Sequence, residues 1–223
     1  MTPTSEPRDW DVRADELATA AIGREQPTAW FDELYAEGLA GAVSMPWDRV
    51  EPQVLLKEWA GRQGLDGTGR TAVVVGCGLG ADAVYLASLG FTVTAFDVAP
   101  TAVEVARERF AGSGVDFRVA DLLALPPEWQ RSFDLVVEIF TLQALPEPPR
   151  SAAAQAVTGL VADGGTLLAI AFRADGSSPA DAGPPFPLER GFVEGLARDG
   201  LEVVLIEELD GARAAAWRAT YRR

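Results

Sequence analysis

The chain has 223 residues, 48% of them apolar, which is enough to bury one full core and predicts one domain or a domain with an appendage. It contains no run of about 18 apolar residues, and its N-terminus is polar and acidic, so we expect a cytoplasmic protein with neither a signal peptide nor a membrane partner. The formal charge of −14 opposes the approach of phosphate backbones, which disfavours nucleic acid as a partner and favours a small molecule.

The first part of the chain predicts short helices that precede the main domain. The spacing of apolar side chains indicates one helix that ends near Ile22, a second over residues 28–39 and a third over residues 50–61. We predict that residues 1–65 form a helical lid on a domain that spans residues 66–223. The lid carries the aromatic residues Trp30, Phe31, Tyr35 and Trp47.

From Arg70 onward, strand patterns alternate with helical patterns. Strands are predicted at residues 71–76, 91–96, 115–120, 133–138 and 166–172, and helices at 80–89, 100–110, 150–161 and near 188–198. Such alternation is typical of βαβ units, in which helices cover both faces of a parallel sheet. The proline-rich stretch 173–187 has no periodicity and predicts a long loop, which in a compact domain is often functional.

The C-terminal segment departs from this alternation. Two strand patterns, at residues 201–209 and 212–222, are separated only by Asp210-Gly211, a dipeptide that favours a tight hairpin turn. The predicted fold class is therefore α/β, with a seven-stranded, mostly parallel sheet, helices on both faces and a C-terminal antiparallel hairpin.

A glycine-rich loop, Gly76-Cys77-Gly78-Leu79-Gly80, directly follows the first predicted strand. Glycine permits a sharp turn and the close approach of a ligand, and the next helix offers unpaired backbone N–H groups. The second strand ends in Asp97, 21 residues after Gly76, near the offset at which an acidic residue binds ribose hydroxyls. The third ends in Asp121 and Leu122 at the same sheet edge, where an adenine amine finds an acceptor. This pattern predicts an adenosine-containing ligand.

Two nucleotide cofactors compete for this pattern. With Ala81 the loop also matches GxGxxA, a dinucleotide fingerprint. Hydride transfer is disfavoured because the chain has no histidine and no lysine four residues after a tyrosine, and because NAD does not need the second acidic strand end. S-adenosylmethionine explains more of the sequence, and an NAD(P)-dependent oxidoreductase is the less favoured alternative.

Longer stretches carry a resemblance to a known family. The segment VVVGCGLGADAVYLASLGFTVTAFDVAPTAVEVARERF, with ADLLALP and FDLVVEIFTLQALP after it, resembles the class I S-adenosylmethionine-dependent methyltransferases from about Arg70 to the C-terminus. The resemblance implies a Rossmann-like fold and S-adenosylmethionine as cofactor. Met45-Pro46-Trp47-Asp48 and Gly183-Pro184-Pro185-Phe186 are similar to the thiopurine and the methyl-halide or thiol methyltransferases.

The resemblance also implies roles for individual residues. The glycines line the methionine part of the cofactor, Asp97 holds the ribose, and Asp121 with Leu122 lies at the adenine. Glu138, at the end of the fourth strand, faces the methyl group as the candidate catalytic residue. Trp30 and Trp47 of the lid place aromatic faces near the positively charged sulfonium of the cofactor. The implied cofactor-binding set is Trp30, Trp47, Gly76, Cys77, Gly78, Gly80, Asp97, Val98, Asp121, Leu122 and Glu138.

Each assignment has a structural alternative. Either aspartate could instead cap a helix, and the cysteine could be a small filler. The aromatic residues could belong to a core, and Glu138 could belong to a buried hydrogen-bond network. If Glu138 is a base or orients the acceptor, Glu138→Gln should lower kcat by about 10²-fold.

The residues that are missing restrict the mechanism. No histidine is present and Cys77 is the only cysteine, so His-base mechanisms are excluded and we predict no metal site. Amino-methylating enzymes of the resembled family carry an Asn/Asp-Pro-Pro-aromatic motif at the end of the fourth strand. This chain has Glu138-Ile139-Phe140-Thr141 there, which disfavours planar amines of nucleic acid as acceptors. The predicted function is methyl transfer to a small-molecule S, N, O or halide nucleophile. The lack of a His base favours a soft or already ionised acceptor, and a non-catalytic adenosine-ligand binding protein is the alternative.

Overall fold

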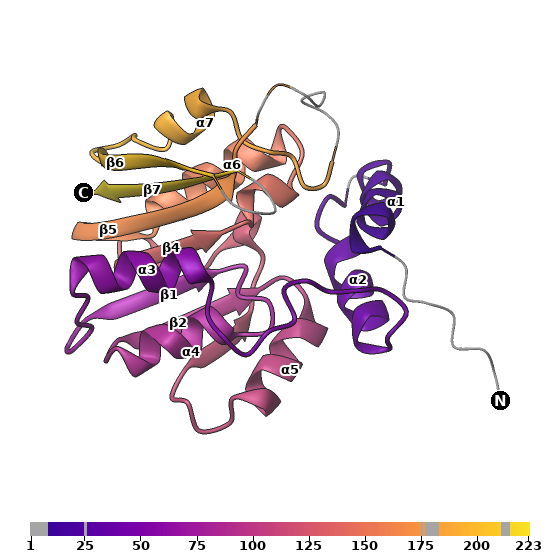
Figure 1. Ribbon diagram of the computed structural model, residues 1–223, viewed down its shortest axis with the longest axis horizontal. Helices are drawn as coiled ribbons and strands as arrows, with labels where there is room; N and C mark the ends of the chain where they lie inside the picture. Colours follow the sequence, from indigo (N-terminus) through magenta and orange to yellow (C-terminus); the bar gives the residue numbers. More distant parts are fainter. Residues whose placement is uncertain (1–8, 25, 175, 177–182, 211–214) are drawn as a thin grey trace.

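The computed structural model describes residues 9–24, 26–174, 176, 183–210 and 215–223. Seven strands form one sheet in the order β3-β2-β1-β4-β5-β7-β6 (Figure 1). Strands β1 to β5 run parallel, and β7 lies antiparallel between β5 and β6. The predicted fold class is confirmed. The strands are β1 (Thr71–Val75), β2 (Thr92–Asp97), β3 (Asp116–Val119), β4 (Phe133–Ile139), β5 (Val161–Phe172), β6 (Glu202–Leu209) and β7 (Ala216–Arg222).

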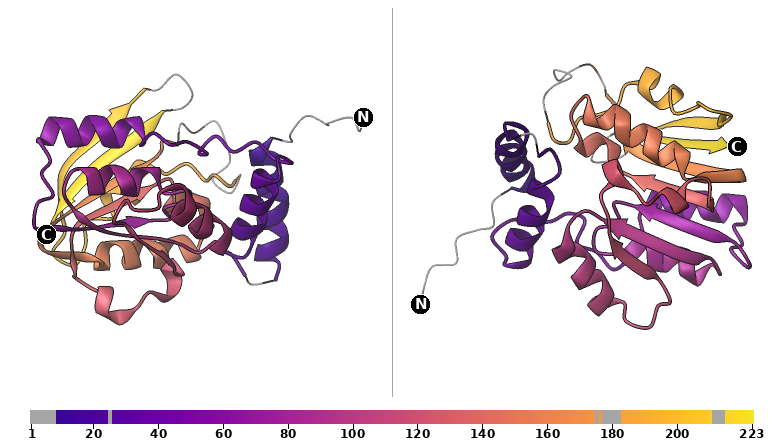
Figure 2. Two further views of the ribbon diagram at one scale, coloured as in Figure 1. Left: turned by 90° about the horizontal axis from the view of Figure 1, so that it is seen from below. Right: turned by 180° about the vertical axis from the view of Figure 1, so that it is seen from behind.

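Helices cover both faces of the sheet (Figure 2). The side chains of β1 alternate between the faces: Ala72 and Val74 pack with α3, α4 and α5, whereas Val73 and Val75 pack with α6 and α7. The helices are α1 (Trp10–Ile22), α2 (Trp30–Leu39), α3 (Val54–Gln63), α4 (Ala81–Ser88), α5 (Pro100–Arg109), α6 (Pro149–Gly159) and α7 (Arg190–Glu194), with 3₁₀ turns at Leu122–Ala124, Pro127–Trp129 and Leu142–Ala144.

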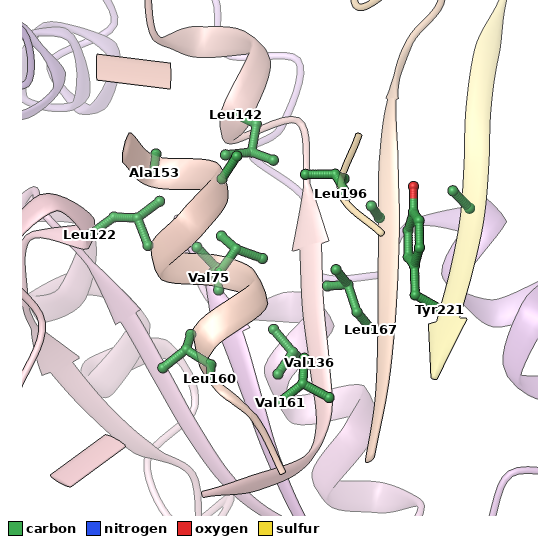
Figure 3. Close-up of a cluster of buried hydrophobic side chains, with 14 of the residues drawn as sticks. Val75, Leu122, Val136, Leu142, Ala153, Leu160, Val161, Leu167, Leu196 and Tyr221 are labelled. Atoms are coloured by element: carbon green, nitrogen blue, oxygen red, sulfur yellow. The ribbon is translucent and has the colours of Figure 1, made fainter. Parts of the chain in front are cut away.

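The larger core cluster lies between the sheet and α6. Figure 3 shows Val75, Val136 and Leu167, from three neighbouring strands, close to the helix that carries Ala153. All four side chains are at most 1% exposed. Full burial of a Val or Leu side chain contributes about 1.5–3 kcal/mol, and the small alanine lets the helix approach the sheet closely. This packing makes the sheet a rigid support for the loops at its carboxyl edge.

The C-terminal antiparallel pair differs from its prediction at the turn. The ladder between β6 and β7 ends at the pair Leu209–Ala216, so residues 210–215 separate the strands, and the predicted two-residue turn at Asp210-Gly211 is wrong. Residues 211–214 lie outside the described part of the chain. The predicted helix near 188–198 is also shorter, because α7 contains Gly191 and is followed by Gly195, and glycine lowers helix stability.

Helices α1 and α2 pack on each other and lie beside the carboxyl edge of the sheet (Figures 1 and 2). Arg13 of α1 donates to Glu37 of α2 at 2.8 and 2.5 Å. Helix α3, which was predicted as part of the lid, packs on the sheet instead, where Trp59 Nε1 donates to Thr220 Oγ1 at 2.9 Å. We therefore reserve the name lid for residues 9–53. No helix in the described ranges has the length and apolar character to cross a membrane.

Candidate functional site

A cavity of ≈ 980 Å³ lies at the carboxyl edge of the sheet, under the lid. Beside it the strand order changes direction between β1 and β4, which is where open α/β sheets bind ligands. Its volume is at the upper end of the ~300–1,000 Å³ usual for small-molecule sites. The structure brings together ten of the predicted site residues in its wall: Trp30, Trp47, Gly76, Cys77, Gly78, Gly80, Asp97, Val98, Asp121 and Leu122.

The three loop glycines have left-handed backbones, with φ of 58° at Gly76, 50° at Gly78 and 93° at Gly80. A Cβ on Gly76 would overlap the side chain of Thr141, and one on Gly78 would lie 2.8 Å from Tyr35 Oη. Glycine is therefore required by both conformation and space. Burial raises the pKa of the Cys77 thiol well above its ordinary value, which makes it a weak nucleophile and supports its interpretation as a small filler.

Asp97 ties the glycine loop to the end of β2. Its side chain accepts hydrogen bonds from Gly78 N at 2.9 Å and from Ala99 N at 3.0 Å, one on each carboxylate oxygen. Burial raises the pKa of Asp97, and the two backbone donors act in the opposite direction. Each oxygen keeps a further lone pair, and the residue lines the cavity next to Val98. The carboxylate can therefore accept ligand hydroxyls as well.

Asp121 caps a turn and also lies at the cavity. Its Oδ1 accepts a hydrogen bond from Leu123 N at 2.8 Å, so it caps the 3₁₀ turn after β3. It also lines the cavity together with Leu122. A capping role and a place beside a ligand are compatible, because a carboxylate has about four acceptor positions.

Glu138 is not among the residues that line the cavity, unlike the other predicted site residues. It is fully buried, and its Oε1 accepts hydrogen bonds from Thr141 N at 2.7 Å and Leu142 N at 2.9 Å. Burial raises the pKa of Glu138 to about 7. Thr141 Oγ1 in turn donates to Val75 O at 3.1 Å. Glu138 thus fixes the turn after β4, and Thr141 of that turn bonds to Val75, the residue before the glycine loop.

The lid contributes aromatic rings to the cavity. Trp30 stacks on Phe31 with ring centroids 3.9 Å apart, and Trp47 lies edge-on to Trp10 at 5.1 Å and to Tyr35 at 6.2 Å. Tyr35 is missing from the set of residues predicted for the site, although the structure puts its hydroxyl beside Gly78. The only sequence signal for it is that Tyr35 shares a short helix with Trp30.

Polar contacts of Asp32, Asp48, Arg49 and Gln53 dock the lid on the main domain, and Gln53 N donates to Asp82 at 2.6 Å. Asp32 accepts a hydrogen bond from Thr101 N, at the start of α5, at 2.8 Å. Arg109 pairs with Asp48 at 2.8 Å, and Arg49 pairs with Asp82 at 3.2 Å. The partners are far apart in the sequence, so local patterns do not reveal these contacts.

The sheet order divides the cavity into two halves. The half beside β3, β2 and β1 holds Asp121, Asp97 and the glycine loop. The other half is mainly apolar, and in it the rings of Phe140 and Phe172 lie 4.7 Å apart. No motif in the sequence assigns most of its residues to the site. The lining residues of this half are Ile139, Phe140, Gln143, Ala144, Leu145, Phe172, Pro184, Pro185, Leu209, Asp210 and Ala216.

Known proteins are similar in sequence to part of this sheet domain. A family profile described as "Methyltransferase domain" matches residues 72–165. A "Ubiquinone biosynthesis O-methyltransferase" of Xanthomonas axonopodis pv. citri (strain 306) is 39% identical over 147 residues, which cover 61% of this chain and 60% of that protein. The chain thus matches about 60% of the length of this curated relative.

Solved structures extend the similarity to most of the fold. One, described as "Conversion of a Disulfide Bond into a Thioacetal Group during Echinomycin Biosynthesis", has a TM-score of 0.72 and 26% identity and covers 88% of this chain and 91% of its own. Another is the Burkholderia thailandensis 1,6-didemethyltoxoflavin-N1-methyltransferase with bound S-adenosylhomocysteine. Its TM-score is 0.62 at 18% identity, with 95% of this chain and 87% of its own covered, which shows the fold alone. Residues 72–165 are therefore similar to a methyltransferase domain, and the fold is similar to that of a methyltransferase structure with bound S-adenosylhomocysteine.

Proposed function

We propose that the chain binds S-adenosylmethionine in the cavity and transfers its methyl group to a small, uncharged or soft acceptor. The observation that carries this proposal is the division of one cavity into a half with the glycine loop, Asp97 and Asp121 and a half with mainly apolar walls. The O-methyltransferase activity for which the curated relative is named and the S-adenosylhomocysteine bound in a structural neighbour support it.

The residues present fit the cofactor. Gly76 and Gly78 line the cavity and would lie against the methionine part, and Asp97 would accept the ribose hydroxyls. Asp121 would lie at the adenine. The lid would exclude water and present aromatic faces to a positive charge. S-adenosylmethionine supplies an electrophilic methyl group when it is bound.

The described lining residues offer no obvious general base. Asp97 and Asp121 accept backbone bonds in the cofactor half. Asp82 is paired with Arg49 and Asp210 with Arg173, and Glu138 does not line the cavity. A nucleophile that is ionised or uncharged with a free lone pair is therefore favoured over an alcohol, which keeps a proton to be removed. Sulfur fits this requirement best, since a thiol ionises at a lower pH than a phenol. The structural neighbour described for disulfide-to-thioacetal conversion also concerns sulfur.

The proposal extends to the methyltransferase branch, the cellular location and the kind of partner. Membership of the thiopurine and thiol methyltransferase branch rests on the short motifs around Trp47 and Pro185, whereas the curated relative is named for O-methylation in ubiquinone biosynthesis. A cytoplasmic location and the absence of a nucleic-acid partner rest on composition and charge.

Turnover with model acceptors tests the proposal. The purified chain is incubated with S-adenosylmethionine and either thiophenol or catechol at about pH 7.5, and S-adenosylhomocysteine and the methylated product are quantified. We expect thiophenol to react about 10²-fold faster, because no base assists the catechol. Binding of S-adenosylhomocysteine without turnover on a wider thiol, amine and halide panel would indicate the non-catalytic alternative. Stabilisation by NADH but not by S-adenosylhomocysteine would contradict the cofactor assignment.

Loss of a docking contact of the lid should weaken cofactor retention. Asp32→Ala removes the acceptor for Thr101 N, a loss comparable to that of a helix cap of about 1 kcal/mol. We expect S-adenosylhomocysteine to dissociate about fivefold faster in stopped-flow displacement. Asp48→Ala is the matched control, because its half-exposed pair with Arg109 should contribute less. A larger effect at Asp48 than at Asp32 would contradict this role of Asp32 in lid docking.

A further inference from the structure

Gln143 is a buried amide in the wall of the apolar half of the cavity. It is 2% exposed and lines the cavity. Its Oε1 accepts a hydrogen bond from Phe172 N at 2.6 Å, and its backbone carbonyl accepts one from Phe186 N at 2.7 Å. The side-chain oxygen is therefore held at the end of β5, and the backbone of Gln143 is bonded to the segment that carries Pro184 and Pro185.

The amide nitrogen of Gln143 has a free donor. In the described part of the chain, Nε2 donates to no protein acceptor. This nitrogen is also not fully buried, so it keeps some exposed surface. Because the residue is otherwise buried, the remaining exposure of this nitrogen is to the cavity that it lines. A buried amide donor gains from pairing with a ligand acceptor and costs free energy when it is left unpaired.

The surroundings restrict the charge of the ligand. Arg49 is the only cation among the described lining residues, and it is paired with Asp82 at 3.2 Å. Asp210, which also lines this half, is paired with Arg173 at 2.8 Å. A carboxylate or phosphate would find no unpaired positive charge here, whereas an uncharged ring would lie against aromatic walls.

We propose that the apolar half of the cavity binds an aromatic molecule that carries no carboxylate or phosphate and whose carbonyl oxygen accepts a hydrogen bond from Gln143 Nε2. Phe140 and Phe172 bury its ring. This inference rests on the proposed function only in naming the bound molecule as the methyl acceptor. Gln143 acts as a specificity-determining residue, since it would distinguish a carbonyl-bearing ring from an isosteric hydrocarbon.

Three small molecules of similar size test the proposal without requiring turnover. Acetophenone carries the carbonyl, ethylbenzene has nearly the same shape without it, and benzoate adds a negative charge. Binding of each is measured by calorimetry on protein saturated with S-adenosylhomocysteine. We expect acetophenone to bind about tenfold more tightly than ethylbenzene and benzoate to bind more weakly than acetophenone. The carbonyl stretch of bound acetophenone should shift to lower frequency in the infrared spectrum.

The variant Gln143→Glu isolates the donor. It keeps an oxygen for Phe172 N and replaces the cavity-facing NH₂ by a carboxyl oxygen. We expect the preference for acetophenone and the infrared shift to be lost at about pH 8, while affinity for S-adenosylhomocysteine stays within threefold. Gln155→Glu, on the exposed surface of α6, is the matched control and should leave both readouts unchanged.

The outcomes separate the two proposals. Equal affinity for acetophenone and ethylbenzene, a preference that survives in Gln143→Glu, or tighter binding of benzoate would each overturn the role of Gln143. If S-adenosylhomocysteine does not bind, the proposed function fails, and the same ligands are offered to the protein alone, where the same preference is still required. If the variant unfolds, the three-ligand comparison and the infrared shift in the parent protein decide the question.

Discussion

Asp97→Ala is expected to weaken the binding of S-adenosylhomocysteine by roughly 30- to 900-fold, or about 2–4 kcal/mol. The buried carboxylate would lose its bonds to two ribose hydroxyls. The substitution also removes the acceptor for Gly78 N and Ala99 N, so the glycine loop loses its tie to the end of β2. Isothermal titration calorimetry on the folded variant measures the effect.

The control for Asp97 is Asp116→Ala. Asp116 is an exposed carboxylate on β3 whose partner, Arg118, is also exposed, so its removal should leave cofactor affinity unchanged. Affinity of the Asp97→Ala protein within threefold of the parent would remove Asp97 from the cofactor site. An equal loss in both variants would point to a general effect of net charge.

Glu138→Ala is expected to lower the free energy of unfolding by about 2–5 kcal/mol, because two buried N–H groups lose their acceptor. Glu138→Gln keeps an oxygen for both donors, so it should remain within about 1 kcal/mol of the parent at pH 5. Since Glu138 is outside the cavity wall, we expect Glu138→Gln to retain turnover per folded molecule. Urea unfolding and a turnover assay on both variants check this. A loss of about 10²-fold in kcat with unchanged stability would restore a direct catalytic role.

The raised pKa of Glu138 also predicts a pH dependence. A glutamate has a pKa of about 4.3 when unfolded, and here the folded value is about 7. The folded state therefore holds the proton more tightly, so this contribution to stability is complete below about pH 4 and is lost as the pH rises through 7. A tenfold change in proton affinity corresponds to about 1.4 kcal/mol, so the loss of stability between these two pKa values is on the order of 4 kcal/mol.

The comparison with Glu138→Gln isolates this effect. Glutamine does not ionise, and all other groups, including Asp97 with its raised pKa, titrate in both proteins. The free energy of unfolding of the variant should therefore rise relative to that of the parent between about pH 4.5 and pH 8. Two parallel stability curves over this range would show that the parent glutamate is ionised throughout.

The sequence by itself determined the features that depend on local pattern. Alternating segments predicted the sheet and its helices, because side-chain periodicity follows directly from backbone geometry. The glycine loop, Asp97 and Asp121 could be assigned to one edge, because the carboxyl ends of parallel strands meet there. Ten predicted residues line one cavity for this reason.

Only the tertiary structure decided what depends on contacts between distant segments. Glu138 ends a strand next to the cavity, yet its side chain points to the amides of the following turn, and strand position alone does not show this. Asp32 docks the lid on a helix 69 residues away. Gln143 is presented to the cavity because Phe172 N, 29 residues away, fixes its oxygen. Such contacts arise from packing of the whole chain, since hydrogen-bond partners of buried polar groups are chosen by proximity in space and not by spacing in sequence.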